Sequence, residues 1–180
     1  QDELPQSAGG RTITTTEPKF IPQEAVELKL AGEVTIRVRL VDCVGFKVEG
    51  AAGHLEDGAE RLVKTPWYDH EIPFTQAAEL GTRKVITDHS TIGVVVTTDG
   101  SFSDLPQETY LDAENQAISE LKKLHKPFLV LVNSSHPSSR TAREAAERIE
   151  KQHSVAAMPV NCAQLSEEDI RQIMEQILYE

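Results

Sequence analysis

An aspartate and a glycine follow a short apolar run in the stretch 40–45 (LVDCVG). In nucleotide hydrolases that have a phosphate-binding loop, an aspartate at such a strand end holds Mg²⁺, usually through water. The glycine has no Cβ, so its backbone N–H can approach a γ-phosphate closely. We therefore interpret Asp42 as a candidate Mg²⁺ ligand and Gly45 as a candidate nucleotide contact. The alternative is an Asp-Gly turn after a strand, which is common without any ligand.

Threonines occupy positions 12, 14, 15 and 16, upstream of this aspartate. In switch-type nucleotide hydrolases, a threonine at this place in the chain offers its hydroxyl to Mg²⁺ and its N–H to the γ-phosphate, and the order of its loop depends on the triphosphate. A threonine run alone is weak evidence because such runs are also common in β-prone loops. Its position before a hairpin that leads into Asp42 strengthens the interpretation.

Two further strand ends carry polar residues that could contact a nucleobase. In the stretch 131–136 (LVNSSH), Ser134 and His136 stand where a GTPase has the lysine and the final aspartate of Asn-Lys-x-Asp. Neutral histidine has a single acceptor nitrogen and cannot copy the two contacts that the aspartate makes with guanine. The pattern thus favours adenine. Asn133, Ser134 and Cys162, which lies in the short stretch 160–163, are the candidate nucleotide contacts.

Phe46 directly follows Gly45, at the place where many GTPases have the glutamine that orients the attacking water. Either another group positions this water, or hydrolysis is slow and needs an activator or self-assembly. Asp99-Gly100 follows another apolar run. We expect it to form a turn, with nucleotide contact as the less favoured alternative.

Hydrophobic periodicity indicates the elements that must position these residues. Apolar residues alternate over 26–30 and 34–40 around Ala31-Gly32-Glu33, which predicts an antiparallel hairpin. The runs 92–98 and 128–132 are typical of strands buried on both faces, and 154–160 predicts a short strand. Helices are predicted over 74–89, over 107–125, after the cap candidates Ser138-Ser139, and from the capping box at 166–169 onward. Residues 1–25 are expected to be loop and 46–73 a long surface excursion.

Strands that alternate with helices predict an α/β fold with a mostly parallel sheet, helices on both faces and an antiparallel edge hairpin. Ligands bind beyond the carboxyl ends of the strands in such sheets. We expect a three-layer P-loop NTPase of the TRAFAC GTPase-like type, with residues 1–180 as one domain and 1–25 as its switch-I-like loop. The first strand, phosphate-binding loop and first helix of this fold are expected upstream of Gln1. Without that strand, the strands at 34–41 and 92–98 have unpaired edges.

Composition restricts the class of partner. The 180 residues suffice for one domain with a core, and 29 acidic against 18 basic residues give a formal net charge of −11, which argues against nucleic-acid binding. No apolar run approaches the roughly 20 residues that span a bilayer. Cys43 and Cys162 are far apart in sequence, which favours reduced thiols in a cytosolic compartment. The six histidines form no paired metal-binding spacing, so a metal cluster built from them is not expected.

Several longer segments resemble the stage IV sporulation protein A family, the spore-coat morphogenetic ATPases of endospore-forming Firmicutes. These segments are residues 1–7 (QDELPQS), 15–20 (TTEPKF), 39–45 (RLVDCVG), 65–68 (TPWY), 79–85 (ELGTRKV) and 89–95 (HSTIGVV). The resemblance covers essentially the whole chain. It implies a GTPase-like fold that hydrolyses ATP with Mg²⁺, and hydrolysis that drives self-assembly into the basement layer of the coat.

By matching motif, the resemblance makes Asp42 the Mg²⁺-associated acid and makes Thr15 and Thr16 the sensor threonines needed for hydrolysis, with Thr15 a further Mg²⁺ ligand. The family's Gly-x-x-x-x-Gly-Lys-Ser loop would lie upstream of Gln1, so this segment alone is expected to bind nucleotide poorly. The resemblance also implies action in the mother-cell cytoplasm at the forespore surface. The implied partners are further copies of the protein, a small amphipathic membrane protein that recruits it, and other coat proteins.

Two other functions stay open at this point. The protein could be a structural, self-assembling coat scaffold in which nucleotide is incidental. It could also be a switch GTPase of another TRAFAC family, although such a GTPase would need a guanine-reading aspartate that His136 does not supply. A receiver domain with Asp42 as the phospho-acceptor does not fit the initial hairpin or the length.

Overall fold

The computed structural model describes residues 19–51, 54–56 and 58–179. The chain divides into two compact units, a first unit of residues 1–24 and 39–90 and a second unit of residues 25–38 and 91–180. The expectation that residues 1–180 form a single domain stays a prediction. None of the described helices is long and apolar enough to cross a membrane.

The predicted hairpin is confirmed. Strands β1 (Lys19–Lys29) and β2 (Thr35–Asp42) pair in a two-stranded sheet and are joined by a 3-10 turn, Ala31–Glu33. The Leu30 N–H donates to the Val34 carbonyl at 2.8 Å across this turn. The loop expected over residues 1–25 is wrong for residues 19–25, which lie in β1. Pro22 is tolerated there because each strand of a two-stranded sheet has an open edge that needs no backbone N–H.

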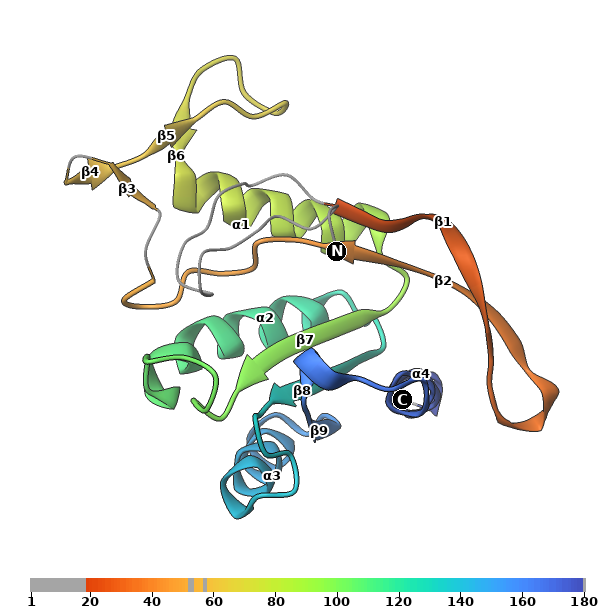
Figure 1. Cartoon of the computed structure of the whole chain (residues 1–180). Helices are drawn as coiled ribbons and strands as arrows, with labels where there is room; N and C mark the ends of the chain where they lie inside the picture. The colour runs from red at the N-terminus through yellow and green to blue at the C-terminus, as the bar shows by residue number, and fades with distance from the viewer. Residues whose placement is uncertain (1–18, 52–53, 57, 180) are drawn as a thin grey trace. The chain divides into compact units, whose positions relative to one another are not determined.

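The second unit contains the predicted parallel sheet, with strand order β7 (Gly93–Thr98), β8 (Phe128–Asn133) and β9 (Ala157–Val160). Each is parallel to its neighbour, and Thr98 pairs with Asn133, which pairs with Val160. The carboxyl ends of the three strands therefore lie side by side at one end of this sheet, as Figure 1 shows. We call this end the carboxyl edge of the sheet.

Helices cover both faces of this sheet, as predicted (Figure 1). A 3-10 turn (Gln107–Tyr110) leads into α2 (Leu111–Lys123), which packs on β7, and α3 (Arg140–His153) packs on β8 and β9. On the opposite face α4 (Glu167–Tyr179) packs on β8, after a 3-10 turn at Cys162–Gln164. The core on this face consists of Leu30, Leu129, Leu131, Val160, Ile173, Met174 and Ile177.

The expectation that β7 is buried on both faces is wrong for one face. Val95 and Thr97 are buried towards α2, but Val94 and Val96 are 39% and 59% exposed. Val94 pairs with Leu129 and Val96 with Leu131, so these valines share the face that α4 covers. They are exposed because α4 packs on β8 rather than on β7, and because β7 has a strand partner on only one side among the described residues.

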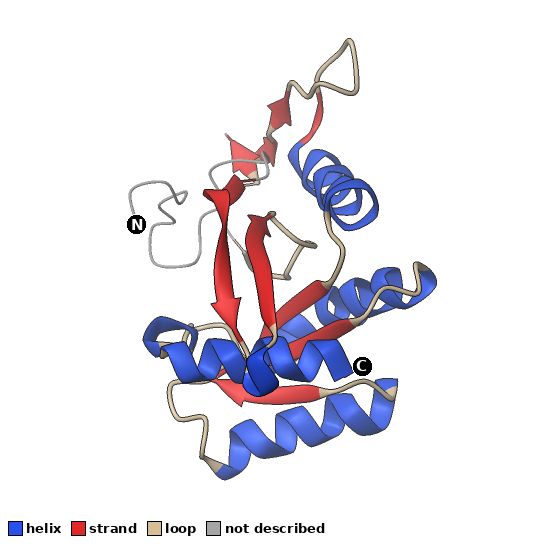
Figure 2. Cartoon of the chain, turned by 90° about the vertical axis from the view of Figure 1, so that its right-hand side faces the viewer, coloured by secondary structure: helices blue, strands red, loops and turns tan. Residues whose placement is uncertain are grey.

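The described part of the first unit contains a helix and two small ribbons (Figure 2). Strands β3 (Leu55–Glu56) and β4 (Ala59–Glu60) form one antiparallel ribbon, and β5 (Leu62–Val63) and β6 (Ile72–Pro73) form the other. Helix α1 (Phe74–Lys84) follows and continues as a π-helical turn, Val85–His89, which confirms the helix predicted over 74–89. The Arg61 guanidinium lies 4.2 Å from the centroid of the buried Phe74 ring and covers the start of α1.

Candidate functional site

The loops after β8 and β9 are joined by the side chain of Asn133. Its Oδ1 accepts a hydrogen bond from the backbone N–H of Cys162 at 2.9 Å. Cys162 begins a 3-10 turn that the Asn161 side chain caps by accepting from the Ala163 N–H. Two of the candidate nucleotide contacts are therefore brought together at the carboxyl edge of the sheet. Burial raises the pKa of the Cys162 thiol, so the thiol stays protonated at neutral pH.

Ser134 is also at this edge, but its side chain points into the protein. The residue is 1% exposed, and its hydroxyl donates to Asp99 Oδ2 at 2.6 Å. The Ser134 hydroxyl oxygen in turn accepts from the backbone N–H of His136 at 3.1 Å. His136 itself is exposed. Ser134 therefore shapes the loop from within instead of presenting its hydroxyl to a ligand.

Asp99 has a larger role here than the turn that the sequence predicts. It does form a turn, because its Oδ1 accepts from both the N–H and the hydroxyl of Ser101, at 3.0 and 2.6 Å. Desolvation acts to raise the pKa of the Asp99 carboxyl, but the hydrogen bonds from Ser101 and Ser134 outweigh it and the net pKa is lowered. Asp99 is therefore an anion that links the loop after β7 to the loop after β8. The only sequence signal for this link is the Asp-Gly-Ser order directly after a strand.

In the first unit, Asp42 is the last residue of β2 and its side chain is exposed. Partial desolvation by its neighbours nevertheless raises the pKa of the Asp42 carboxyl, against a hydrogen bond from the Cys43 backbone that lowers it. The carboxylate is thus a hard oxygen ligand that is not fully hydrated. No group of three or more His, Cys, Asp or Glu side chains that could hold a metal by themselves occurs among the described residues. Nucleotide-associated Mg²⁺ needs only one or two protein oxygens, so Asp42 fits that ion and not a protein-only cage.

Gly45 lies in the loop after Asp42 and is hydrogen-bonded to Thr82 of α1. The Gly45 N–H donates to the Thr82 hydroxyl at 2.9 Å, and the hydroxyl donates to the Gly45 carbonyl at 3.2 Å. Gly45 has φ +84°, a left-handed conformation that favours glycine, although an added Cβ would meet nothing within 4 Å. Thr82 is buried. Sequence reasoning missed it, since a threonine inside a predicted helix carries no signal of such a contact.

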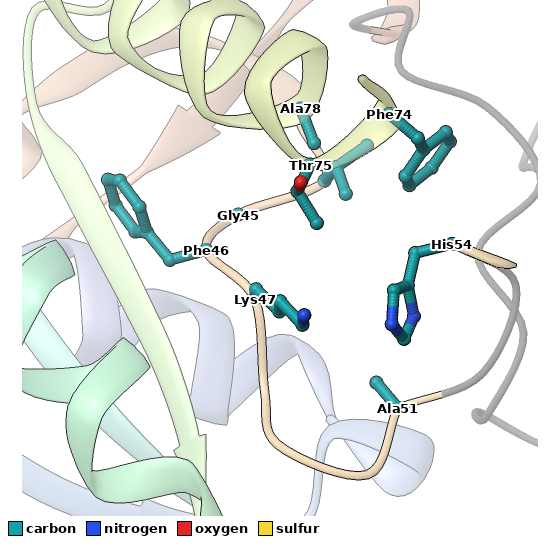
Figure 3. Close-up of a pocket in the computed structure, with 9 residues that line it drawn as sticks. Gly45, Phe46, Lys47, Ala51, His54, Phe74, Thr75 and Ala78 are labelled. Atoms are coloured by element: carbon teal, nitrogen blue, oxygen red, sulfur yellow. The ribbon is translucent and has the colours of Figure 1, made fainter. Parts of the chain in front are cut away.

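A shallow pocket opens beside this loop, within the first unit (Figure 3). Its walls are mostly apolar, while Lys47 and His54 point into it. Thr75, at the start of α1, also lines the pocket and donates its backbone N–H to Glu60 at 3.3 Å. The Thr75 hydroxyl bonds the same carboxylate and is the main cause of the lowered pKa of Glu60. The segment 46–73 therefore packs against α1 through this contact.

The remaining candidates, Thr15 and Thr16, lie outside the described residues. Asp42 and Gly45 belong to the first unit, while Asn133, Ser134 and Cys162 belong to the second and are joined there. The assignment of these residues to a nucleotide site stays a prediction.

Comparison with known proteins gives one consistent result. A family model described as stage IV sporulation protein A, ATPase domain, matches residues 1–180. The stage IV sporulation protein A of Clostridioides difficile (strain 630) is 48% identical over 180 residues, which are 100% of this chain and 37% of that protein. The proteins of the same name from Bacillus anthracis and Bacillus subtilis (strain 168) are each 43% identical over 180 residues. The chain thus spans 37% of the length of these relatives. No solved structure matches it.

Proposed function

Because the chain belongs to the stage IV sporulation protein A family and matches its ATPase domain over residues 1–180, we propose that it is the ATP-hydrolysing part of a spore-coat assembly protein. This match over the whole chain is the observation that carries the proposal. Hydrolysis of ATP in the full-length protein drives its self-assembly into the basement layer of the coat. The protein acts in the mother-cell cytoplasm at the forespore surface.

Asp42 is proposed as the residue that holds Mg²⁺ through water, with Thr15 as a further ligand and Thr16 as a sensor of the γ-phosphate. When bound, Mg²⁺ neutralises charge on the β- and γ-phosphates. The position of Asp42 supports this role, because an exposed carboxylate at the end of β2 can reach a ligand without unfolding the strand. Gly45 and Thr82 hold the loop that follows, so the backbone beyond Asp42 has a fixed conformation.

The carboxyl edge of the sheet in the second unit is proposed to hold adenine. Asn133 supports this because it joins the loops after β8 and β9, the two loops that flank the base in GTPase-like folds. The loop after β8 has no carboxylate over 133–136, so nothing there can make the paired contacts that select guanine. ATP is therefore preferred to GTP.

The finer fold is proposed to be that of a TRAFAC GTPase-like P-loop NTPase, in which a further strand pairs with the outer edge of β7 and leads into the phosphate-binding loop and a helix. Two observations support it. The Gly93 N–H bonds the Pro127 carbonyl on the β8 side, so the N–H groups of Val94 and Val96 point to the outer edge. The same valines are exposed on the α4 face, where a helix after the added strand would cover them.

Hydrogen exchange on the full-length protein tests this fold directly. If the added strand pairs with β7, the amides of Val94 and Val96 exchange slowly, as do those of Val95 and Thr97 on the β8 side. Fast exchange at Val94 and Val96 beside slow exchange at Val95 and Thr97 would show that the outer edge of β7 is open and would contradict the proposed fold.

The partners proposed are further copies of the protein in a polymer, a small amphipathic protein of the forespore membrane that recruits it, and other coat proteins. No nucleic-acid partner is proposed, since the formal net charge of −11 disfavours binding to a phosphate backbone. These partners rest on the family alone.

Turnover and polymerisation of the full-length protein test the function. Asp42→Ala is expected to lower ATP turnover at least a hundredfold and to abolish polymerisation, while the control Asp69→Ala, an exposed aspartate of the segment 46–73, changes neither. Normal polymers from an Asp42→Ala protein without turnover would instead establish the scaffold in which nucleotide is incidental. Faster turnover of GTP than of ATP by the wild type would contradict the adenine assignment.

A further inference from the structure

Asp99 lies at the centre of a hydrogen-bond network that joins two loops at the carboxyl edge of the sheet. One carboxylate oxygen accepts from the Ser101 N–H and hydroxyl, at 3.0 and 2.6 Å. The other accepts from the Ser134 hydroxyl at 2.6 Å. Asp99 thus fixes the rotamers of one serine on its own loop and one serine on the loop after β8.

Those two serines in turn hold the backbone of the loop after β8. The Ser101 hydroxyl oxygen accepts from the Ser135 N–H at 2.9 Å, and the Ser134 hydroxyl oxygen accepts from the His136 N–H at 3.1 Å. Each hydroxyl has only one proton, and each gives that proton to Asp99. Their lone pairs are therefore oriented towards the two backbone N–H groups, so the carboxylate sets the conformation of residues 135 and 136.

We infer that Asp99 is the positioning residue of the loop after β8, which is proposed to bind the nucleobase, and that it acts through Ser101 and Ser134. The inference rests on the proposed nucleotide site and deepens it, because it names the group that preorganises the base-binding side. A loop held in its binding conformation before the ligand arrives loses less conformational freedom on binding. Removing the carboxylate therefore weakens nucleotide binding while leaving the phosphate-side residues Asp42, Thr15 and Thr16 intact.

The nearly isosteric Asp99→Asn variant isolates this role. The two serines donate to different oxygens of the Asp99 carboxylate, and asparagine replaces one of these oxygens by an NH2 group that cannot accept. At least one hydroxyl therefore loses its acceptor, and both lose the negative charge that they now contact. In the full-length protein we expect the KM for ATP to rise about tenfold, equal to about 1.4 kcal/mol, with kcat within twofold of wild type. The control Asp112→Asn makes the same change at an exposed position in the first turn of α2 and leaves KM unchanged.

Ser134→Ala removes the other partner of the link and should raise KM by a similar factor. The double variant should then have a KM close to that of either single variant, because both changes break one chain of contacts. Ser138→Ala, in the same loop and exposed, is the control. In Asp99→Asn, the amides of Ser135 and His136 should also exchange faster with solvent than in wild type.

A positioning role and a purely structural role of Asp99 give different kinetics. A purely structural role would lower the folded fraction, and with it the kcat per total protein, without raising KM, and that result would overturn the inference. Wild-type turnover of ATP, together with an Asp99→Asn KM within twofold of wild type, would overturn the role of Asp99 and leave the proposed function standing. A full-length wild type that neither binds nor hydrolyses ATP would overturn both.

Discussion

Replacing Glu114 by alanine is expected to destabilise the second unit by about 3 kcal/mol, because Glu114 forms a buried ion pair that joins three elements. Its side chain is 1% exposed, on α2. The carboxylate meets Arg148 of α3 at 2.8 and 3.0 Å and accepts from the Thr97 hydroxyl of β7 at 2.8 Å. Thr97 lies two residues before Asp99, so this ion pair also supports the strand that positions the proposed site.

The magnitude follows from what each variant leaves behind. Removing one partner of a buried ion pair costs about 3–5 kcal/mol, and Arg148 is 31% exposed and can turn to water, so Glu114→Ala falls at the low end of that range. Arg148→Met leaves the Glu114 carboxylate buried with Thr97 as its remaining partner, so we expect this variant to lose about 4 kcal/mol of stability. The double variant Glu114→Leu, Arg148→Met removes both charges. It should lie within about 1–2 kcal/mol of wild type, the remainder being the lost acceptor of Thr97.

Native-state hydrogen exchange of the β7 and β8 amides in the full-length protein measures these changes. A loss of about 3 kcal/mol corresponds to exchange roughly 150-fold faster. Asp112→Ala, at an exposed position on the same helix, should change the free energy of unfolding measured by exchange by less than about 0.5 kcal/mol. The reasoning is refuted if Glu114→Ala costs less than about 1 kcal/mol, or if the double variant is less stable than Arg148→Met.

Three further changes have defined outcomes. Gly45→Ala should lower the free energy of unfolding in urea by about 1–2 kcal/mol, because the φ of +84° is unfavourable for a residue with a Cβ. An unchanged free energy of unfolding would mean that the loop relaxes to another backbone conformation. Ser139→Ala should cost about 1 kcal/mol, since the hydroxyl caps α3 by accepting from the Ala142 N–H at 3.1 Å; Ser138→Ala is the matched control. The lowered pKa of Asp99 means that its stabilisation is present above the unfolded-state pKa of about 3.9 and is lost as pH falls through the folded-state pKa. The difference in unfolding free energy between wild type and Asp99→Asn should therefore be constant from about pH 8 to 5 and shrink below about pH 4, and a difference that changes between pH 8 and 5 would point to another group.

Local signals in the sequence predicted most elements because the chemistry of each signal lies within a few residues. The box at 166–169 is one case: the Ser166 hydroxyl accepts from the Asp169 N–H at 3.1 Å, and the Asp169 carboxylate accepts from the Ser166 N–H at 2.8 Å. The continuous apolar runs likewise became β7 and β8. The exposure of Val94 and Val96 was not predictable in this way. It depends on which strand α4 covers, and a β-branched run looks the same whether one face or both are covered.

In the candidate site, the sequence likewise predicted where Ser134 lies along the chain but not the direction of its side chain. Alignment of Asn-Ser-Ser-His with Asn-Lys-x-Asp places Ser134 where a GTPase has its lysine, and that position is at the carboxyl edge of the sheet as expected. The alignment does not give the direction of the side chain, which depends on Asp99, 35 positions earlier in the sequence. Since Ser134 faces inward and is bonded to Asp99, it takes no direct part in reading a base. The proposed preference for adenine therefore rests on the absence of a carboxylate at His136, while Ser134 holds the backbone of His136 by accepting from its N–H.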